Sequence, residues 1–187
     1  MLRLPNGKGL SAWLFFRKCT YPSLEVCNLI RAGGHGCGLH LEDSRSYETF
    51  EEELQSLQET LGEPVKAFSK HGSGRFQYGR HHYAPYEPLK YEIWGKRAGL
   101  SLFMGNREDP SEAPYTRGAL TCYPSAFWLE PDWRDTQRFP LRWLLSAAQQ
   151  RDIVLLLHPD NVISSLEIMR EFLTVLENLR VQPARSA

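Results

Sequence analysis

The sequence predicts an α/β protein in which parallel strands alternate with helices. Three observations favour this class: short apolar runs recur along the chain, helix-like segments separate them, and the longest polar segments follow strands. This alternation is typical of a doubly wound sheet or of a (β/α) barrel, and barrels carry their functional residues on loops that follow strands. The chain has 187 residues. Because a complete barrel needs about 250 residues, we expect an incomplete (β/α) barrel of about six βα units. It would form a single domain over residues 1–187.

Six apolar segments predict the strands. The first is rich in aromatic residues, and the last is the most hydrophobic, as expected of a strand that is buried on both faces. The expected strands are 11–16, 37–41, 65–68, 100–104, 118–123 and 153–157.

Helices are predicted where apolar residues recur every three or four positions between a start signal and a stop signal. The clearest case begins after Ser46, has Phe50, Leu54 and Leu57 on one face, and ends at Gly62. Ser164 opens a sequence typical of a capping box before the last helix. The expected helices are 23–32, 46–61, 88–98, 140–148 and 164–179, with long loops at 69–86 and 124–139.

The composition argues against several classes of function. Twenty-two basic residues balance 22 acidic ones, so no net charge favours nucleic acid or an anionic membrane as a partner. The apolar run at 10–16 is too short for a secretory signal or a membrane span, which predicts a cytoplasmic protein. No Gly-x-Gly-x-x-Gly follows the first strand and no Walker sequence occurs, so nucleotide cofactors lose support.

Three of the expected strands end close to a histidine. These residues are His40, His71 and His158. In β/α proteins the active site is built at the carboxyl ends of parallel strands. The sequence therefore predicts that the three side chains face one functional site.

The motifs along the chain resemble those of the polysaccharide deacetylase (NodB-homology) family. The segment Gly34-His35-Gly36-Cys37-Gly38-Leu39-His40 is similar to that family's Gly-His-Glu-Ile-Gly-x-His strand. Residues 64–72 stand where the family has a Pro-Val-x-x-Phe-Arg-x-Pro-x-Gly strand and turn. Residues 153–159 resemble the terminal Leu-x-His motif before a closing helix. The order and spacing of these motifs match over nearly the whole chain.

The resemblance implies metal-assisted hydrolysis of an N-acetyl or O-acetyl group on a glycan. In the family one Asp and two His hold a zinc-like divalent ion, a second Asp is the general base, and the terminal His is the general acid. Here His158 would be the acid and His40 a metal ligand. The second metal His is replaced by Ser44, so Asp43 beside it is expected to supply the ligand. His71, on a Gly-rich loop that also carries His81 and His82, is expected to contact the substrate. Trp128 and Trp133 lie on the loop 124–139 and are expected either to form a platform on which the sugar stacks, with Trp128 as the substrate contact, or to cover the end of the barrel.

The chain departs from the family where the two aspartates should be. The strand that carries them would precede residue 11, and residues 2–9 contain no acid. One hypothesis is a divergent deacetylase that takes its missing carboxylate from Asp43, Glu108 or Asp109. The alternative is a non-catalytic remnant that binds a glycan or a protein, or a fragment whose open barrel edge allows self-association.

Overall fold

The computed structural model describes residues 12–71, 87–107 and 109–181. It is a mixed α/β protein built on a six-stranded, mostly parallel sheet, as the sequence predicts at this level. The strands of this sheet are β1 Trp13–Phe16, β2 Gly36–Leu41, β3 Ala67–Lys70, β4 Leu102–Arg107, β5 Tyr115–Arg117 and β6 Leu120–Ser125. Their spatial order is β1-β2-β3-β4-β6-β5, and β5 alone among them runs antiparallel to its neighbour.

A second sheet has two parallel strands, β7 Phe127–Trp128 and β8 Leu155–Leu156. The sequence predicts neither β5 nor β7. It also predicts that residues 153–157 are buried on both faces, and this is wrong. These residues are only half-buried, because β8 has two residues and, in the part of the chain described, pairs with β7 alone.

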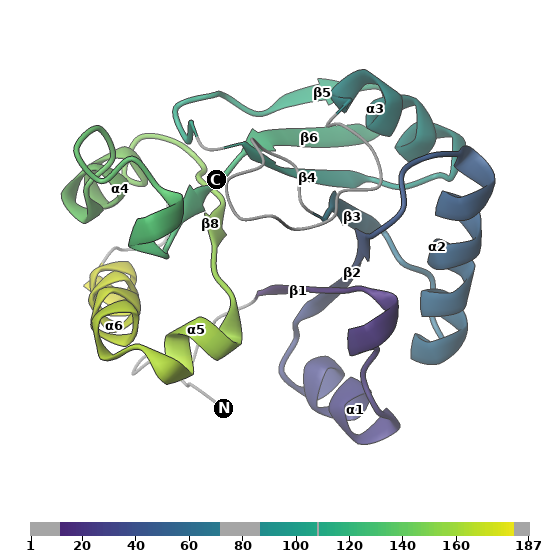
Figure 1. Cartoon of the computed structure of the whole chain (residues 1–187), viewed down its shortest axis with the longest axis horizontal. Helices are drawn as coiled ribbons and strands as arrows, with labels where there is room; N and C mark the ends of the chain where they lie inside the picture. Colours follow the sequence, from purple (N-terminus) through teal and green to yellow (C-terminus); the bar gives the residue numbers. More distant parts are fainter. Residues whose placement is uncertain (1–11, 72–86, 108, 182–187) are drawn as a thin grey trace.

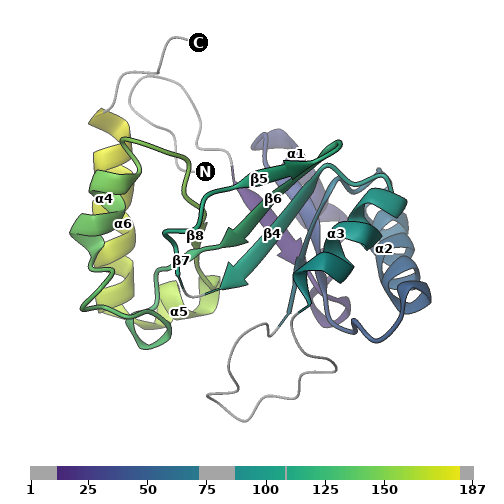
Figure 2. The same cartoon turned by 90° about the horizontal axis from the view of Figure 1, so that it is seen from above.

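Helices flank both sheets. They are α1 Leu24–Ala32, α2 Tyr47–Leu61, α3 Pro88–Arg97, α4 Leu141–Ala147, α5 Pro159–Ser164 and α6 Leu166–Val181, with single 3-10 turns at Lys18–Thr20 and Pro131–Trp133. Figure 1 shows α2 and α3 along one side of the six-stranded sheet. Figure 2 shows β7 and β8 between that sheet and the group formed by α4 and α6. None of the described helices is both long and apolar enough to cross a membrane.

The ends of α2 agree with the capping signals in the sequence. The Ser46 side chain accepts a hydrogen bond from the Thr49 backbone N–H, which satisfies one of the unpaired donors at the helix start. Gly62 ends the helix in the left-handed conformation that glycine adopts without a Cβ clash. Phe50, Leu54 and Leu57 are buried as predicted.

The register of the sheet separates a core face from a site face. Leu39, Phe68, Phe103 and Cys122 form one row across β2, β3, β4 and β6, and all four belong to the hydrophobic core under the helices. Because successive strand residues point to opposite faces, the next row lies on the other side. That row is His40, Ser69, Met104 and Tyr123.

Candidate functional site

The candidate site lies at the carboxyl ends of the parallel strands. His40 and Ser69 are direct neighbours in the register of β2 and β3, so their side chains share the site face. His71 follows β3 by one residue, and its backbone N–H donates to the Leu41 carbonyl at 2.8 Å. The sheet thus brings together two of the three histidines that the sequence places at strand ends.

His40 and His71 are in direct contact. His71 Nδ1 lies 3.0 Å from His40 Nε2, and the two rings meet edge to face with centroids 5.0 Å apart. His40 Nδ1 lies 2.7 Å from Ser69 Oγ. On the other side, Arg17 NH1 lies 3.3 Å from His71 Nε2. Four side chains from three strand ends therefore form one continuous chain of hydrogen bonds.

His40 is held in its neutral form. Burial is the main cause that lowers its pKa from 6.5 to about 3, and electrostatic interactions with His71, His158, Arg17 and Lys70 act in the same direction. His158, two residues after β8 of the second sheet, also contributes to this effect.

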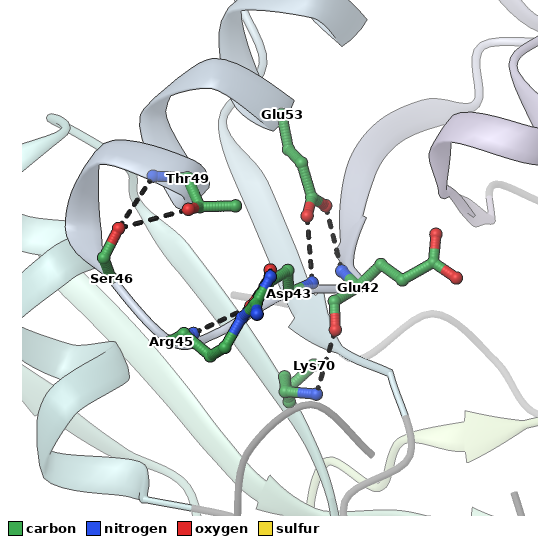
Figure 3. A network of polar contacts seen from close by, with 7 residues as sticks. All are labelled: Glu42, Asp43, Arg45, Ser46, Thr49, Glu53 and Lys70. Atoms are coloured by element: carbon green, nitrogen blue, oxygen red, sulfur yellow. Dashed lines mark hydrogen bonds and ion pairs between the residues drawn. The ribbon is translucent and has the colours of Figure 1, made fainter. Parts of the chain in front are cut away.

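Two side chains fix the turn that follows β2. The Glu53 carboxylate, on α2, accepts hydrogen bonds from the backbone N–H groups of Glu42 and Asp43, each at 2.9 Å. Burial raises the pKa of Glu53, against the effect of these two bonds. Lys70 Nζ donates to the carbonyl oxygens of Glu42 at 3.3 Å and His71 at 2.6 Å. Figure 3 shows both sets of contacts on the Glu42 backbone.

Lys70 is almost completely buried, with 1% of its surface exposed. Burial lowers its pKa, while the nearby carboxylates of Glu53, Asp43 and Glu42 act in the opposite direction. A buried ammonium is costly unless its protons are bonded. Its two carbonyl acceptors belong to the ends of β2 and β3, so Lys70 ties these two strand ends together.

The Asp43 carboxylate is engaged by Arg45. Arg45 Nε donates to both carboxylate oxygens, at 3.0 and 2.9 Å, and Arg45 NH2 completes a bidentate contact. Figure 3 shows the two side chains turned toward each other. The hydrogen bond from the Arg45 side chain is the main cause that lowers the pKa of Asp43. Asp43 is therefore an ionised carboxylate, and both of its oxygens are hydrogen-bonded to the guanidinium group of Arg45.

The second sheet builds a separate acid–base pair. Its register places Phe127 beside Leu155 and Trp128 beside Leu156. Glu130 and His158 each follow two residues later, so they meet side by side. Glu130 Oε1 accepts hydrogen bonds from His158 Nδ1 at 2.9 Å and from the His158 backbone N–H at 2.8 Å. Asn161 Nδ2 donates to the same oxygen at 3.2 Å.

Glu130 is buried and ionised. Burial by itself raises its pKa, but the hydrogen bonds from the side chain and backbone of His158 and from Asn161 outweigh that effect, and the pKa is lowered. The exposed fraction of the side chain is 3% for Glu130 and 41% for His158. The carboxylate is thus inside the protein and the imidazole faces outward, the arrangement of an oriented proton donor or acceptor.

Two tryptophans pack around His158. The ring centroids of Trp128 and Trp133 lie 5.8 and 5.2 Å from that of His158, and 5.0 Å from each other. Trp128 is 8% exposed, so most of its ring is covered, whereas Trp133 is only half-buried. Of the two, Trp133 offers more surface to a ligand next to His158.

The sequence predicts no functional role for Arg17, Ser69 or Glu130, although the structure brings all three into contact with predicted site residues. For Glu130 a signal exists: it is an acid directly after a short aromatic and apolar run, the position where strand-end carboxylates occur. Arg17 and Ser69 carry no comparable signal, because their roles depend on partners 54 and 29 residues away.

Asp109, one of the carboxylates expected to replace the missing aspartates, is engaged by other residues. Asp109 accepts hydrogen bonds from Ser111 and pairs with Arg138 at 3.0 Å. Glu108 lies outside the described residues, as do His81, His82 and most of the loop expected after residue 69. Within the described ranges, no group of three or more His, Cys, Asp or Glu residues is arranged to hold a metal ion.

Comparison with protein-family models, with curated proteins and with solved structures finds no match for this chain.

Proposed function

We propose that the chain is a polysaccharide deacetylase-like protein with an incomplete (β/α) barrel, whose strand-end site hydrolyses acetyl groups on a glycan. The observation that carries the proposal is the Glu130–His158 pair, joined at 2.9 Å at the ends of adjacent parallel strands. Hydrolysis of an amide or ester needs a group that can give a proton to the leaving atom, and histidine is the residue most often used.

Glu130 sets the roles of the two ring nitrogens of His158. An ionised carboxylate can only accept hydrogen bonds, so His158 Nδ1 carries the proton that Glu130 Oε1 accepts. Nε2 is then the nitrogen that exchanges a proton with a substrate. The backbone N–H of His158 donates to the same carboxylate oxygen, which fixes the ring in position. With a proton on each ring nitrogen, His158 is the proposed general acid, and Glu130 orients it.

The glycan would lie over the half-buried ring of Trp133, next to His158. Sugars present an apolar C–H face that packs on aromatic rings, and Trp combines such a surface with a polar N–H group. Trp128 packs against this ring in a tilted arrangement, with 5.0 Å between the ring centroids. His71, the other predicted substrate contact, would lie on the opposite side of the site with His40.

A divalent metal is implied by the family resemblance, with His40 and Asp43 as ligands. The described atoms do not fit that role as they stand. Both ring nitrogens of His40 are engaged, by Ser69 and His71, and the Asp43 carboxylate is engaged by Arg45. A zinc site needs three protein ligands and one open position. His40 and Asp43 therefore have no metal-binding role in the proposed reaction, and their assignment as ligands stays a prediction.

A second function, glycan binding without hydrolysis, is favoured by one observation. The nitrogens of His40 and His71 bond to each other and to Ser69 and Arg17, an arrangement that also suits a rigid binding surface. Trp133 would serve such a surface equally well.

Acetate release separates the two functions. Purified protein is incubated with acetylated oligosaccharides, and free acetate and bound oligosaccharide are both measured. Hydrolysis that His158→Ala reduces by about 100-fold or more supports the deacetylase. His35→Ala is the matched control, because His35 precedes β2 at the opposite end of the sheet and bonds the Ala12 backbone. Binding without acetate release, unchanged by metal addition, favours the second function.

Self-association through an open sheet edge is the proposed partner interaction, and it can be tested at β1. β1 is an edge strand of the six-stranded sheet, and its Trp13 is 42% exposed. Edge strands with apolar side chains pair readily with another chain. Sedimentation velocity over a range of protein concentrations should show a dimer that Trp13→Lys weakens, and a monomer at all concentrations contradicts this expectation.

A further inference from the structure

The hydrogen-bond chain at the ends of β1, β2 and β3 has a direction that its first member determines. Arg17 NH1 contacts His71 Nε2 at 3.3 Å, His71 Nδ1 contacts His40 Nε2 at 3.0 Å, and His40 Nδ1 contacts Ser69 Oγ at 2.7 Å. A neutral imidazole has one donor and one acceptor nitrogen, and a guanidinium has donors only. His71 is neutral in this arrangement, because a doubly protonated ring would place an N–H against the Arg17 donor. The position of every ring proton in the chain then follows from these two rules.

Arg17 sets the direction of the hydrogen bonds in this chain. Because Arg17 must donate, His71 Nε2 is the acceptor and its Nδ1 carries the proton. His71 Nδ1 then donates to His40, so His40 Nε2 is bare and its Nδ1 carries the proton. His40 Nδ1 therefore donates to Ser69 Oγ. Both histidines are neutral Nδ1–H tautomers, and the reverse direction would place two donors face to face at one of the contacts.

This direction of the hydrogen bonds excludes His40 as a general base that activates Ser69. A serine 2.7 Å from an imidazole nitrogen looks like a nucleophile beside its general base. A base must accept the hydroxyl proton, however, and His40 Nδ1 is already protonated. Ser69 Oγ accepts in this contact, so its own hydrogen points elsewhere.

The O–H group of Ser69 is then available to donate a hydrogen bond to a ligand. Ser69 is 8% exposed and lies on the site face in register with His40. Its oxygen contacts His40, and the described residues supply no second partner for it. A buried donor that lacks an acceptor costs free energy. A hydrogen bond to a bound ligand removes that cost.

We propose that Arg17, His71 and His40 form a one-way hydrogen-bond relay, and that it turns the Ser69 hydroxyl into a donor for the carbonyl oxygen of the acetyl group. Bonds in such a chain polarise one another, and the chain starts at a fixed positive charge. A donor aimed at the carbonyl oxygen stabilises the negative charge that develops there during hydrolysis. The role of Ser69 rests on the proposed function, whereas the relay itself does not.

Arg17 is well placed to hold this direction. Its backbone is fixed by Thr20, whose backbone N–H donates to the Arg17 carbonyl at 2.8 Å and whose Oγ1 accepts from the Arg17 N–H at 3.1 Å. Glu42 pairs with the guanidinium at 3.6 Å. Arg17 does not touch the acetyl group in this proposal, so it is a positioning residue and Ser69 is the catalytic one.

Ring-nitrogen NMR tests the relay without any substrate. In wild-type protein with ¹⁵N-labelled histidine, we expect protonated Nδ1 and bare Nε2 for both His40 and His71, assigned with His40→Gln and His71→Gln. Arg17→Met should convert His71, and with it His40, to mixed tautomers, while Arg17→Lys should keep the wild-type pattern. Lys18→Met is the matched control, since it removes an exposed positive charge next to Arg17.

Acetate release tests the role of Ser69. We expect Ser69→Ala to lower kcat by about 100-fold while both tautomers stay as in wild type. Ser69→Thr, which keeps a hydroxyl on a strand residue, should recover most of the loss. Arg17→Met should lower kcat by about 10-fold or more with little change in KM.

The relay, the donor role of Ser69 and the proposed function are each overturned by a different result. A protonated Nε2 on His40 in wild-type protein, or tautomers that Arg17→Met leaves unchanged, overturns the relay. An acetylated Ser69 found by mass spectrometry during turnover overturns the donor role, because it makes Ser69 the nucleophile. If the wild-type protein releases no acetate, the proposed function and the role of Ser69 are both wrong. The NMR spectra then still test the relay by themselves.

Discussion

Glu130 Oε1 accepts hydrogen bonds from both the ring Nδ1 and the backbone N–H of His158, at 2.9 and 2.8 Å. One carboxylate oxygen therefore fixes the position, the tautomer and the outward direction of the imidazole. This double contact exists because β7 and β8 are parallel and in register, so that residues two positions beyond each strand meet. It is the strongest reason to regard His158 as a proton-transfer group.

Replacement of Glu130 by Gln should reduce acetate release by about 10- to 100-fold. The neutral amide keeps the shape and one acceptor, but it removes the charge that favours the Nδ1–H tautomer of His158. The measurement is kcat with an acetylated oligosaccharide as substrate. Asp132→Asn is the control, because Asp132 is an exposed acid two residues away. An equal loss in both variants would show that Glu130 has no specific role.

The outline of the fold could be predicted from the sequence, but the pairings that build the site could not. Ser46 and Gly62 specify α2 through local capping contacts, and the structure has both. The two-residue strand β7 has no such local signal, because only its pairing with β8 makes Phe127 and Trp128 a strand. Register between segments 28 residues apart is a property of tertiary packing.

The same distinction applies to the site. That His40 and His71 face one site follows from strand-end positions that are visible in the sequence, and the structure places them 3.0 Å apart. That Asp43 binds Arg45 is a local contact between residues two positions apart. The family's ligand spacing predicts a metal ligand at Asp43, whereas the nearby Arg45 already engages both oxygens of its carboxylate.

Acid should destabilise the protein through His40. The pKa of His40 is lowered from 6.5 to about 3 by burial and by neighbouring positive charges. Between these values the unfolded chain binds a proton that the folded chain does not, so the stabilisation is complete above about pH 6.5 and is lost as the pH falls toward 3. From pH 7 to pH 4 the loss is about 3 kcal/mol.

Urea denaturation at several pH values measures this dependence. His40→Gln cannot titrate, so its free energy of unfolding should fall less steeply between pH 7 and pH 4 than that of the wild type. His35→Gln serves as the control, because it makes the same substitution at a histidine that does not contact His40. If the wild type and His40→Gln have parallel curves, His40 is not the group responsible.

Glu53→Gln should destabilise the protein by about 1–2 kcal/mol. The Glu53 carboxylate accepts from two adjacent backbone N–H groups, and an amide can accept only one of these bonds while its NH₂ group faces the other donor. The free energy of unfolding in urea measures the effect. Glu52→Gln is a closely matched control, since Glu52 is exposed on the same helix. Equal stability of the two variants would mean that solvent replaces the lost contacts at the turn.

Gly95→Ala should destabilise the protein even though Gly95 lies inside helix α3. In an exposed helix this change stabilises by about 1 kcal/mol. At Gly95, however, a Cβ would lie 2.8 Å from Phe68 Cε1 and 3.1 Å from Leu120 Cδ2, because α3 packs closely on β3 and β6. Overpacking of this kind costs about 1–3 kcal/mol.

The sign of the change in the free energy of unfolding therefore tests the contact between α3 and the sheet. Phe68→Leu removes the ring that the new methyl group would meet, so Gly95→Ala should cost less in that background than in the wild type. Lys96→Ala, at an exposed position next to Gly95, controls for helix propensity. Stabilisation by Gly95→Ala in the wild-type background would show that α3 lies farther from Phe68 than the structure places it.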